Sequence, residues 1–438
     1  MTSRDGGTVQ AWAALGGPGE LAGRVGYRGA SGLGDGPLPV RELARATVGA
    51  CALAAAELAA VRAGGGADDV APLVIDEGAV TTAFVSERHL LVDGRTPVTF
   101  APLSGFWRAA DGWVRTHANY PHHEAALVRV LDAATPQAVA GAIARRTAAD
   151  VQEEVYAAGG LAVAVRQGYG PAQPLVERTE SGVPGRPLGA GTGAPMSGVR
   201  VLDLTRVIAG PVATRTLGLL GADVLRIDAP DLPESDDAYA DTGFGKRSAL
   251  LDLGAAGDRE VFGGLLAGAD VVVTGYRPGA LARYGLEAGE LLAARPGLVV
   301  AELSAWGRQG PWAGRRGFDS LVQAGYGISA ACGDGHGPGV LPAQALDHGT
   351  GYLMAAGVLR ALARGGGQAL RFSLAGTASW LVREVPAAGP AAAGYTPDPW
   401  LRETGSGYGT LRHAVPPLGA ATWGRGPSRW GTDRPAWL

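Results

Sequence analysis

The chain of 438 residues contains little cysteine and little charge. Its two cysteines, Cys51 and Cys332, are too few for a disulfide framework or a zinc–cysteine site, and we expect no metal. Charged residues make up 18% of the chain, below the roughly 25% of an average soluble protein. The 38 basic and 41 acidic residues form no basic stripe, which argues against nucleic acid or an anionic membrane as a partner.

We expect neither a signal peptide nor a membrane-spanning segment. The first seven residues lack the apolar core of a signal peptide. The longest apolar stretch, residues 46–56, ends at Glu57 and is too short to cross a bilayer. We therefore expect a soluble, cytoplasmic protein. Hydrophobic residues still make up 46% of the chain, which is enough for packed cores and excludes wholesale disorder.

Residues 198–382 alternate short apolar strands with helices. Strands are predicted at 199–204, 223–227, 270–273, 298–301 and 369–374. Helices are predicted at 212–220, 258–267, 287–294 and 351–363. Because strands that are apolar on both faces need cover on both faces, this pattern predicts an α/β fold. Its large domain would be a doubly wound, Rossmann-like parallel sheet.

The first half predicts a different organisation. Residues 101–170 are expected to form a smaller α+β domain, with a hairpin over 106–117 that turns at Asp111-Gly112. Three helices should follow in that domain, at 123–131, 136–144 and 149–158. Residues 171–197 are rich in Gly, Pro, Ser and Thr and are interpreted as a linker. Residues 383–438 form a C-terminal tail.

The N-terminal segment, residues 1–100, carries an internal echo of the large domain. Leu38-Pro-Val-Arg-Glu-Leu-Ala44 aligns with Leu341-Pro-Ala-Gln-Ala-Leu-Asp347, 303 residues further on. Each stretch leads into an Ala-rich helix, an arginine, three glycines and a short strand, and residues 72–100 are expected to be short strands. The alternative is convergent low complexity. In the first copy, Ala44 occupies the position of Asp347.

Asp347 is the carboxylate that could carry chemistry. It stands near the start of a long helix, where free N–H groups favour a carboxylate, so it is either a helix cap or a nucleophile. The flanking Gly349 and Gly351 would allow a ligand to approach the backbone, and N–H groups of the helix start could stabilise an oxyanion. His348 is a candidate for tuning this site, with a surface histidine as the alternative.

Several stretches in the second half resemble one family. They are Gly198-Val-Arg-Val-Leu-Asp-Leu-Thr-Arg-Val-Ile-Ala-Gly-Pro211, Leu220-Gly-Ala-Asp-Val-Leu-Arg-Ile227, Gly245-Lys-Arg-Ser248, Arg277-Pro-Gly-Ala280, Leu303-Ser-Ala-Trp-Gly307 and Asp319-Ser-Leu-Val-Gln-Ala324. Together, over residues 198–375, they resemble the family III CoA-transferases, also called the CaiB/BaiF family. No single stretch would be specific, but the ordered set is.

The resemblance implies an activity and a site. It makes Asp347 the nucleophile that moves CoA between an acyl-CoA and a carboxylic acid, through an aspartyl anhydride and an aspartyl-CoA thioester. CoA is then a substrate, and a homodimer of interlocked rings is implied. The positions that match the family's CoA contacts are Val207, Lys246, Arg247, Gly275, Tyr276, Arg277, Ala280 and Arg283.

The chain departs from the family pattern in its order, at two single residues, and after the second strand, where Asp228-Ala-Pro230 stands in place of a basic residue. The stretch that resembles the family's small domain lies within residues 101–170 and precedes the large domain here. The chain therefore resembles a circularly permuted member with a partial repeat. Ile208 replaces the glutamine of oxalate-type members, and Phe318 replaces the histidine of the racemases. Two alternatives therefore stay open: an acyl-CoA isomerase, racemase or redirected biosynthetic enzyme on the same scaffold, and a non-catalytic CoA-binding subunit.

Overall fold

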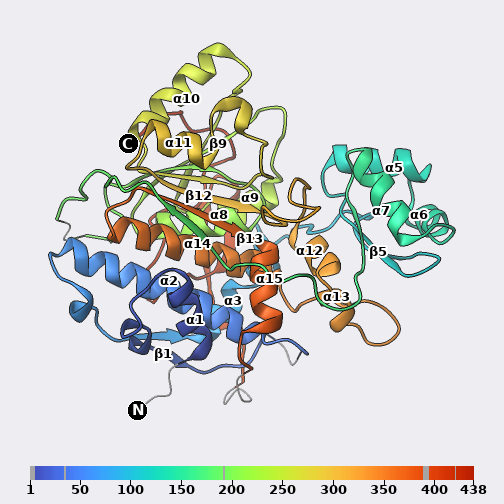
Figure 1. The fold of residues 1–438 in the computed structure, drawn as a ribbon, viewed down its shortest axis with the longest axis horizontal. Helices are drawn as coiled ribbons and strands as arrows, with labels where there is room; N and C mark the ends of the chain where they lie inside the picture. Colours follow the sequence, from blue (N-terminus) through green and yellow to red (C-terminus); the bar gives the residue numbers. More distant parts are fainter. Residues whose placement is uncertain (1–4, 34–35, 191–192, 388–393, 420) are drawn as a thin grey trace.

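A computed structural model describes residues 5–33, 36–190, 193–387, 394–419 and 421–438 (Figure 1). Its centre is a seven-stranded sheet in the order β10-β9-β8-β11-β12-β13-β7. The strands are β7 (Glu177–Glu180), β8 (Arg200–Leu204), β9 (Asp223–Asp228), β10 (Lys246–Leu250), β11 (Val271–Thr274), β12 (Val299–Ser304) and β13 (Gln368–Ser373). All neighbours are parallel except β7, which pairs antiparallel with β13.

Helices cover both faces of this sheet, which confirms the predicted doubly wound architecture. The side chains of Val271 and Val273 belong to a core shared with α8 (Ala209–Leu219) and α14 (Ala345–Ala363). Val272, between them in the strand, packs in a second core with α10 (Ala256–Gly268) and α11 (Ala288–Ala294). Successive residues of a strand point to opposite faces, so strands buried on both sides need to be apolar throughout.

The N-terminal segment forms a further layer on α14 (Figure 1). Helix α2 (Val40–Arg62) lies against α14, and Glu57 of α2 forms a buried ion pair with Arg360 of α14. The guanidinium of Arg360 also lies 4.7 Å from the ring centre of Trp12 in α1 (Gly6–Ala14). By length and composition α2 could cross a membrane, but 72% of its apolar window is buried in the protein, as expected of a core helix.

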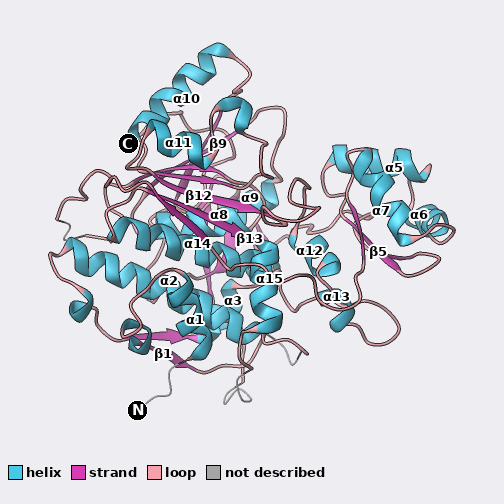
Figure 2. Cartoon of the chain, in the orientation of Figure 1, coloured by secondary structure: helices cyan, strands magenta, loops and turns pink. Residues whose placement is uncertain are grey.

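The region around α2 differs in part from its prediction (Figure 2). Strands β1 (Val25–Arg28) and β2 (Leu73–Asp76) pair in parallel. After β2, however, the chain forms α3 (Glu77–Ala83) and α4 (Ser86–His89) before the short β3 (Leu91–Val92), so the prediction of short strands throughout 72–100 is wrong there. The cause is a cap: the Asp76 carboxylate accepts a hydrogen bond from the Gly78 N–H at 2.9 Å and starts α3.

Residues 106–164 form a smaller α+β unit at the right of Figure 1. Its antiparallel sheet contains β4 (Phe106–Arg108), β5 (Trp113–Thr116) and β6 (Ala162–Ala164). Helices α5 (Pro121–Leu131), α6 (Pro136–Ile143) and α7 (Ala148–Ala157) pack on it around a separate core. The predicted hairpin and the three predicted helices are thus confirmed.

Two segments interpreted as linker and tail contribute to sheets. The segment 171–197, of which residues 191–192 lie outside the described part, contains β7 of the main sheet. The tail forms the hairpin β14 (Leu401–Ser406) and β15 (Gly409–Ala414), and β15 pairs with β3. Its last residues run along the edge strand β10, where Thr432 bridges to Ala249. The strand β10 itself was not predicted.

Candidate active site

Asp347 lies in the first turn of α14, between two cavities. The helix begins at Ala345, six residues before its predicted start at 351. The residue is 6% exposed, and it lines both cavities together with Tyr120, Val207 and Phe318. A buried carboxyl group therefore borders both cavities.

The first cavity, of about 280 Å³, lies at the carboxyl ends of the central strands. That is where open α/β sheets bind ligands. Five of the predicted CoA contacts line it: Val207, Gly275, Tyr276, Arg277 and Ala280. Its lining residues also include Arg206, Arg277, Arg315 and Arg316. Among the described residues, neither Arg277 nor Arg316 has a carboxylate partner within 4 Å.

The second cavity, of about 440 Å³, lies on the other side of Asp347. Its walls come from residues 97–101, from the loop before α5 and from α9 (Asp236–Thr242). Ile208, the residue that replaces a glutamine of the oxalate-type pattern, is one of the lining residues. Unlike the first cavity, this one has no lysine or arginine among its described lining residues.

The start of α14 is capped by a carboxylate from another helix. Asp319, at the first position of α12 (Asp319–Gly325), accepts hydrogen bonds from the N–H groups of Leu346 at 2.9 Å and Asp347 at 3.0 Å. Gln323 donates to the other carboxylate oxygen of Asp319. The expectation that these N–H groups of the helix start stabilise an oxyanion is therefore wrong, because Asp319 already uses them.

The surroundings of Asp347 favour its protonated form. Burial, followed by the charges of Asp319 and Glu87, raises the pKa of Asp347 well above its usual range. His348 is fully buried, so the alternative of a surface histidine is excluded, and its Nε2 lies 3.2 Å from Glu87 Oε2. Burial is the largest effect and opposes ionisation of Glu87, but the hydrogen bond and charge interaction with His348, a backbone hydrogen bond and the charge of Arg88 together lower the pKa of Glu87.

Gly349 and Gly351 serve helix packing instead of ligand approach. A Cβ atom on Gly349 would lie 3.2 Å from Leu43 Cδ2 of α2. On Gly351 it would lie 2.6 Å from the carbonyl oxygen of Ala209, in the first turn of α8. The expectation that these glycines admit a ligand is corrected accordingly: they allow α2 and α8 to lie close to α14.

Three predicted CoA contacts line neither cavity. Lys246 is fully buried, and its Nζ donates to Asp203 Oδ2 at 3.2 Å and to the Pro211 carbonyl at 2.9 Å. Burial, offset only partly by Asp203, lowers the pKa of Lys246 to about 8. Arg247 pairs with Asp223 at 2.6 Å, and Arg283 stacks over Tyr284. The structure thus gives Lys246 and Arg247 structural partners within the sheet and tail.

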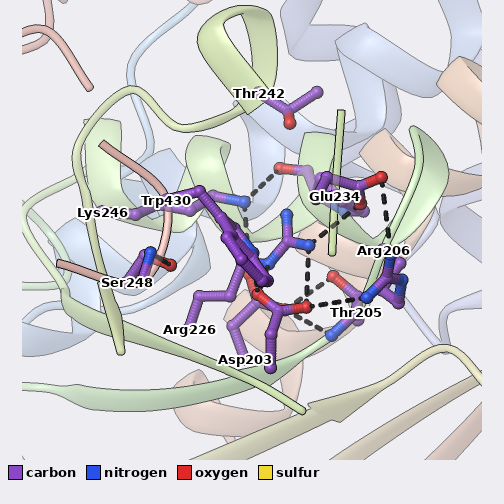
Figure 3. A network of polar contacts seen from close by, with 12 residues as sticks. Asp203, Thr205, Arg206, Arg226, Glu234, Thr242, Lys246, Ser248 and Trp430 are labelled. Atoms are coloured by element: carbon purple, nitrogen blue, oxygen red, sulfur yellow. Dashed lines mark hydrogen bonds and ion pairs between the residues drawn. The ribbon is translucent and has the colours of Figure 1, made fainter. Parts of the chain in front are cut away.

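A polar network next to Lys246 holds the loop that contains Val207 and lines both cavities (Figure 3). Arg226 donates to Glu234 Oε2 at 3.0 Å, and the same oxygen accepts from the N–H of Val207 at 3.2 Å. Val207 has φ 71, a conformation that a β-branched residue adopts only when its surroundings force it. Sequence reasoning singled out Val207 but missed Glu234, because no local pattern links the two.

An aromatic cluster from the small unit lies beside Phe318. The ring of His117 stacks on Phe318 with 3.9 Å between the centroids. His117 lines the second cavity and His123 the first. Burial is the main cause that lowers the pKa of both histidines to about 3, so both are neutral at physiological pH.

The fold and the site define a doubly wound α/β protein with a buried carboxyl group between two ligand-sized cavities. Residues 196–409 match the model of CoA-transferase family III. The match covers just under half of the chain, and over this part the chain is similar to CoA-transferase family III.

Known proteins show similarity over part of their length. The chain is 36% identical over 202 residues to the acetyl-coenzyme A transferase nodX of Hypoxylon pulicicidum, covering 44% of this chain and 34% of that protein. It is 33% identical over 182 residues to the probable fatty acyl-CoA transferase Rv3272 of Mycobacterium tuberculosis, covering 38% and 46%. A crystal structure of a CaiB/BaiF family protein from Brucella suis aligns with 26% identity and a TM-score of 0.40, over 51% of this chain and 67% of that one. The chain thus spans less than half the length of these two curated relatives.

Proposed function

We propose that the chain is an acyl-CoA transferase that moves CoA between an acyl-CoA and a carboxylic acid, with Asp347 as the nucleophile. The observation that carries this proposal is the position of Asp347 between an arginine-lined cavity and a cavity whose described lining residues include no lysine or arginine. CoA is a polyanion, so its phosphates favour the first cavity, and the acyl group then extends past Asp347 into the second.

The proposed chemistry balances without any co-reactant. An ionised Asp347 oxygen attacks the thioester carbonyl, the C–S bond breaks, and CoA leaves as a thiolate with a mixed anhydride behind it. The thiolate then attacks the Asp347 carbonyl carbon, which releases the donor acid as a carboxylate and leaves an aspartyl-CoA thioester. An acceptor carboxylate repeats the two steps in reverse order and restores Asp347.

The start of α8 supplies the donors for the oxyanions of these steps. The side chain of its N-cap residue, Ile208, makes no capping hydrogen bond, so N–H groups of the first turn have no side-chain partner there. Ala209, the first residue of the helix, lines the first cavity beside Asp347. The N-terminal end of a helix favours negative charge, as a tetrahedral oxyanion requires.

Adduct formation at Asp347 tests the proposal. The chain is incubated with a panel of acyl-CoA esters, treated with hydroxylamine or borohydride, and analysed by mass spectrometry. We expect modification at Asp347, none in Asp347→Asn, and unchanged modification in Asp334→Asn, whose side chain is exposed. Absence of any adduct across the panel would reject the transferase, and tight CoA binding without turnover would indicate a non-catalytic subunit.

Acyl-CoA isomerisation is a second candidate, because a histidine of the small unit offers a base. Both ring nitrogens of His123 are buried without a partner among the described residues, and the ring lines the first cavity. A neutral imidazole there is able to accept a proton from the carbon next to a thioester. Deuterium from the solvent at that carbon would support this candidate.

We also propose that the order of the chain arose by circular permutation. The support is that the segment 1–100 packs α2 against α14 and pairs β1 with β2 in parallel, as β12 pairs with β13. The homodimer implied by the resemblance stays a prediction, which light scattering will test, and so does the cytoplasmic location.

A further inference from the structure

We infer that the second cavity is built for an uncharged, largely apolar acyl group and disfavours dicarboxylic substrates. This inference rests on the proposed function, since it takes the second cavity as the place of the acyl group. It is carried by the charges and the walls of that cavity.

The carboxylates around the cavity already have partners outside its lining. Besides Asp347, the lining contains Glu87, Glu234, Asp237 and Asp241. Glu87 pairs with His348 at 3.2 Å, and Glu234 pairs with Arg226 at 3.0 Å. Asp237 pairs with Arg95 at 2.6 Å, and Asp241 pairs with Arg215 at 3.2 Å. None of these partners is itself a lining residue of the cavity.

No lining residue in the described part of the chain offers a positive charge. One histidine, His117, is among the described lining residues, and burial is the main cause that lowers its pKa to about 3. The imidazole is therefore a neutral hydrogen-bonding group. A second carboxylate on a substrate would lose its hydration among paired acids without gaining a cation, which is costly.

Large apolar side chains also contribute to the wall of the cavity. Leu90, Ile208 and Phe318 are among its lining residues, as are Val98 and Phe100 of the segment before the small unit. Val98 is 77% exposed and Phe100 is 37% exposed, which is unusual for large apolar side chains that lie together. An acyl chain in the cavity would cover them, and a volume of about 440 Å³ suits a small-molecule group.

Binding to Asp347→Asn measures this preference without turnover. Titration calorimetry compares hexanoyl-CoA with glutaryl-CoA, whose acyl group has a similar length but ends in a carboxylate. We expect hexanoyl-CoA to bind at least about tenfold more tightly, because the far carboxylate of glutaryl-CoA loses its hydration without gaining a cation. Equal affinities, or tighter binding of glutaryl-CoA, would overturn the inference.

A charge added to the cavity provides the matched test. Ala238, on α9, lines the cavity and is half-buried. In the Asp347→Asn background, Ala238→Lys should reduce the preference for hexanoyl-CoA, whereas Ala238→Gln, of similar length and no charge, should keep it. An unchanged preference in Ala238→Lys would contradict the charge argument. If that variant does not fold, the comparison of the two esters decides alone.

The inference and the proposed function can fail separately. Adducts at Asp347 that form equally well from glutaryl-CoA and hexanoyl-CoA would refute the cavity preference and leave the transferase intact. A preserved affinity difference without any adduct would refute the transferase and keep the preference.

Discussion

The close approach of α8 and α14 at Gly351 leads to a quantitative prediction. In Gly351→Ala the new Cβ would lie 2.6 Å from the carbonyl oxygen of Ala209 and 2.8 and 2.9 Å from Cβ and Cγ1 of Val212. A backbone oxygen has no rotamer by which to move away, so the helices have to separate. Overpacking of this kind costs up to about 3 kcal/mol, and the better helix propensity of alanine returns about 1 kcal/mol. We expect a net loss of about 2 kcal/mol.

Gly349→Ala is the control on the same helix. Its Cβ would lie 3.2 Å from the end of the flexible Leu43 side chain, which is able to shift, so the gain in propensity should dominate. This variant should be neutral or more stable by up to about 1 kcal/mol. The two variants should therefore differ by about 2 to 3 kcal/mol in the free energy of unfolding, measured by urea titration of tryptophan fluorescence.

The catalytic activities of the two variants should differ in the same direction as their stabilities. Displacing the start of α8 moves Val207 and Ala209 relative to Asp347, so kcat should fall in Gly351→Ala and stay near its starting value in Gly349→Ala. The reasoning would be refuted if Gly351→Ala were as stable as Gly349→Ala, because the contact of the two helices would then tolerate the extra atom.

Three further predictions concern charges. Asp319→Asn removes a charge that raises the pKa of Asp347, and since transfer needs ionised Asp347, the acid limb of the pH–rate profile should move to lower pH. An acid limb that stays in place would contradict the influence of Asp319 on Asp347. Lys246→Met should lose about 3 to 5 kcal/mol of stability and keep its CoA affinity, whereas Arg316→Met should keep its stability and bind CoA about tenfold more weakly. If calorimetry showed the opposite pattern, Lys246 would be the CoA contact that the sequence predicted. Glu57→Gln should cost about 3 to 5 kcal/mol in urea unfolding, because it leaves the buried guanidinium on α14 without its counterion, and a loss below about 1 kcal/mol would show that the pair is not truly buried.

The strands of the large sheet could be predicted because their burial leaves a direct trace in the sequence. A strand covered on both faces is a short, uninterrupted apolar run, and Val271–Thr274 is such a run. The helix α3 could not be found in this way. All of its residues are buried, so it lacks the polar face that would reveal a period of 3.6.

Within the site, the sequence identified single residues better than their relations. Asp347 followed from its position and the surrounding motifs, but the carboxylate that caps its helix is 28 residues away. Lys246 lies in a motif that matches CoA contacts, yet a sequence does not distinguish an ammonium directed at a phosphate from one directed at a buried aspartate. That distinction depends on which face of β10 the residue occupies, and β10 was not predicted.

The coverage of the sheet edges has a practical consequence. The strand β7 closes one edge beside β13, and the last residues of the tail lie along β10 at the other. Both segments fall outside residues 196–409, the part that matches the family model. A fragment trimmed to that match would therefore present two open strand edges to solvent, which is a template for intermolecular pairing. Expression of the family core alone should yield aggregates, and the shortest useful piece of this protein must keep both of its borders.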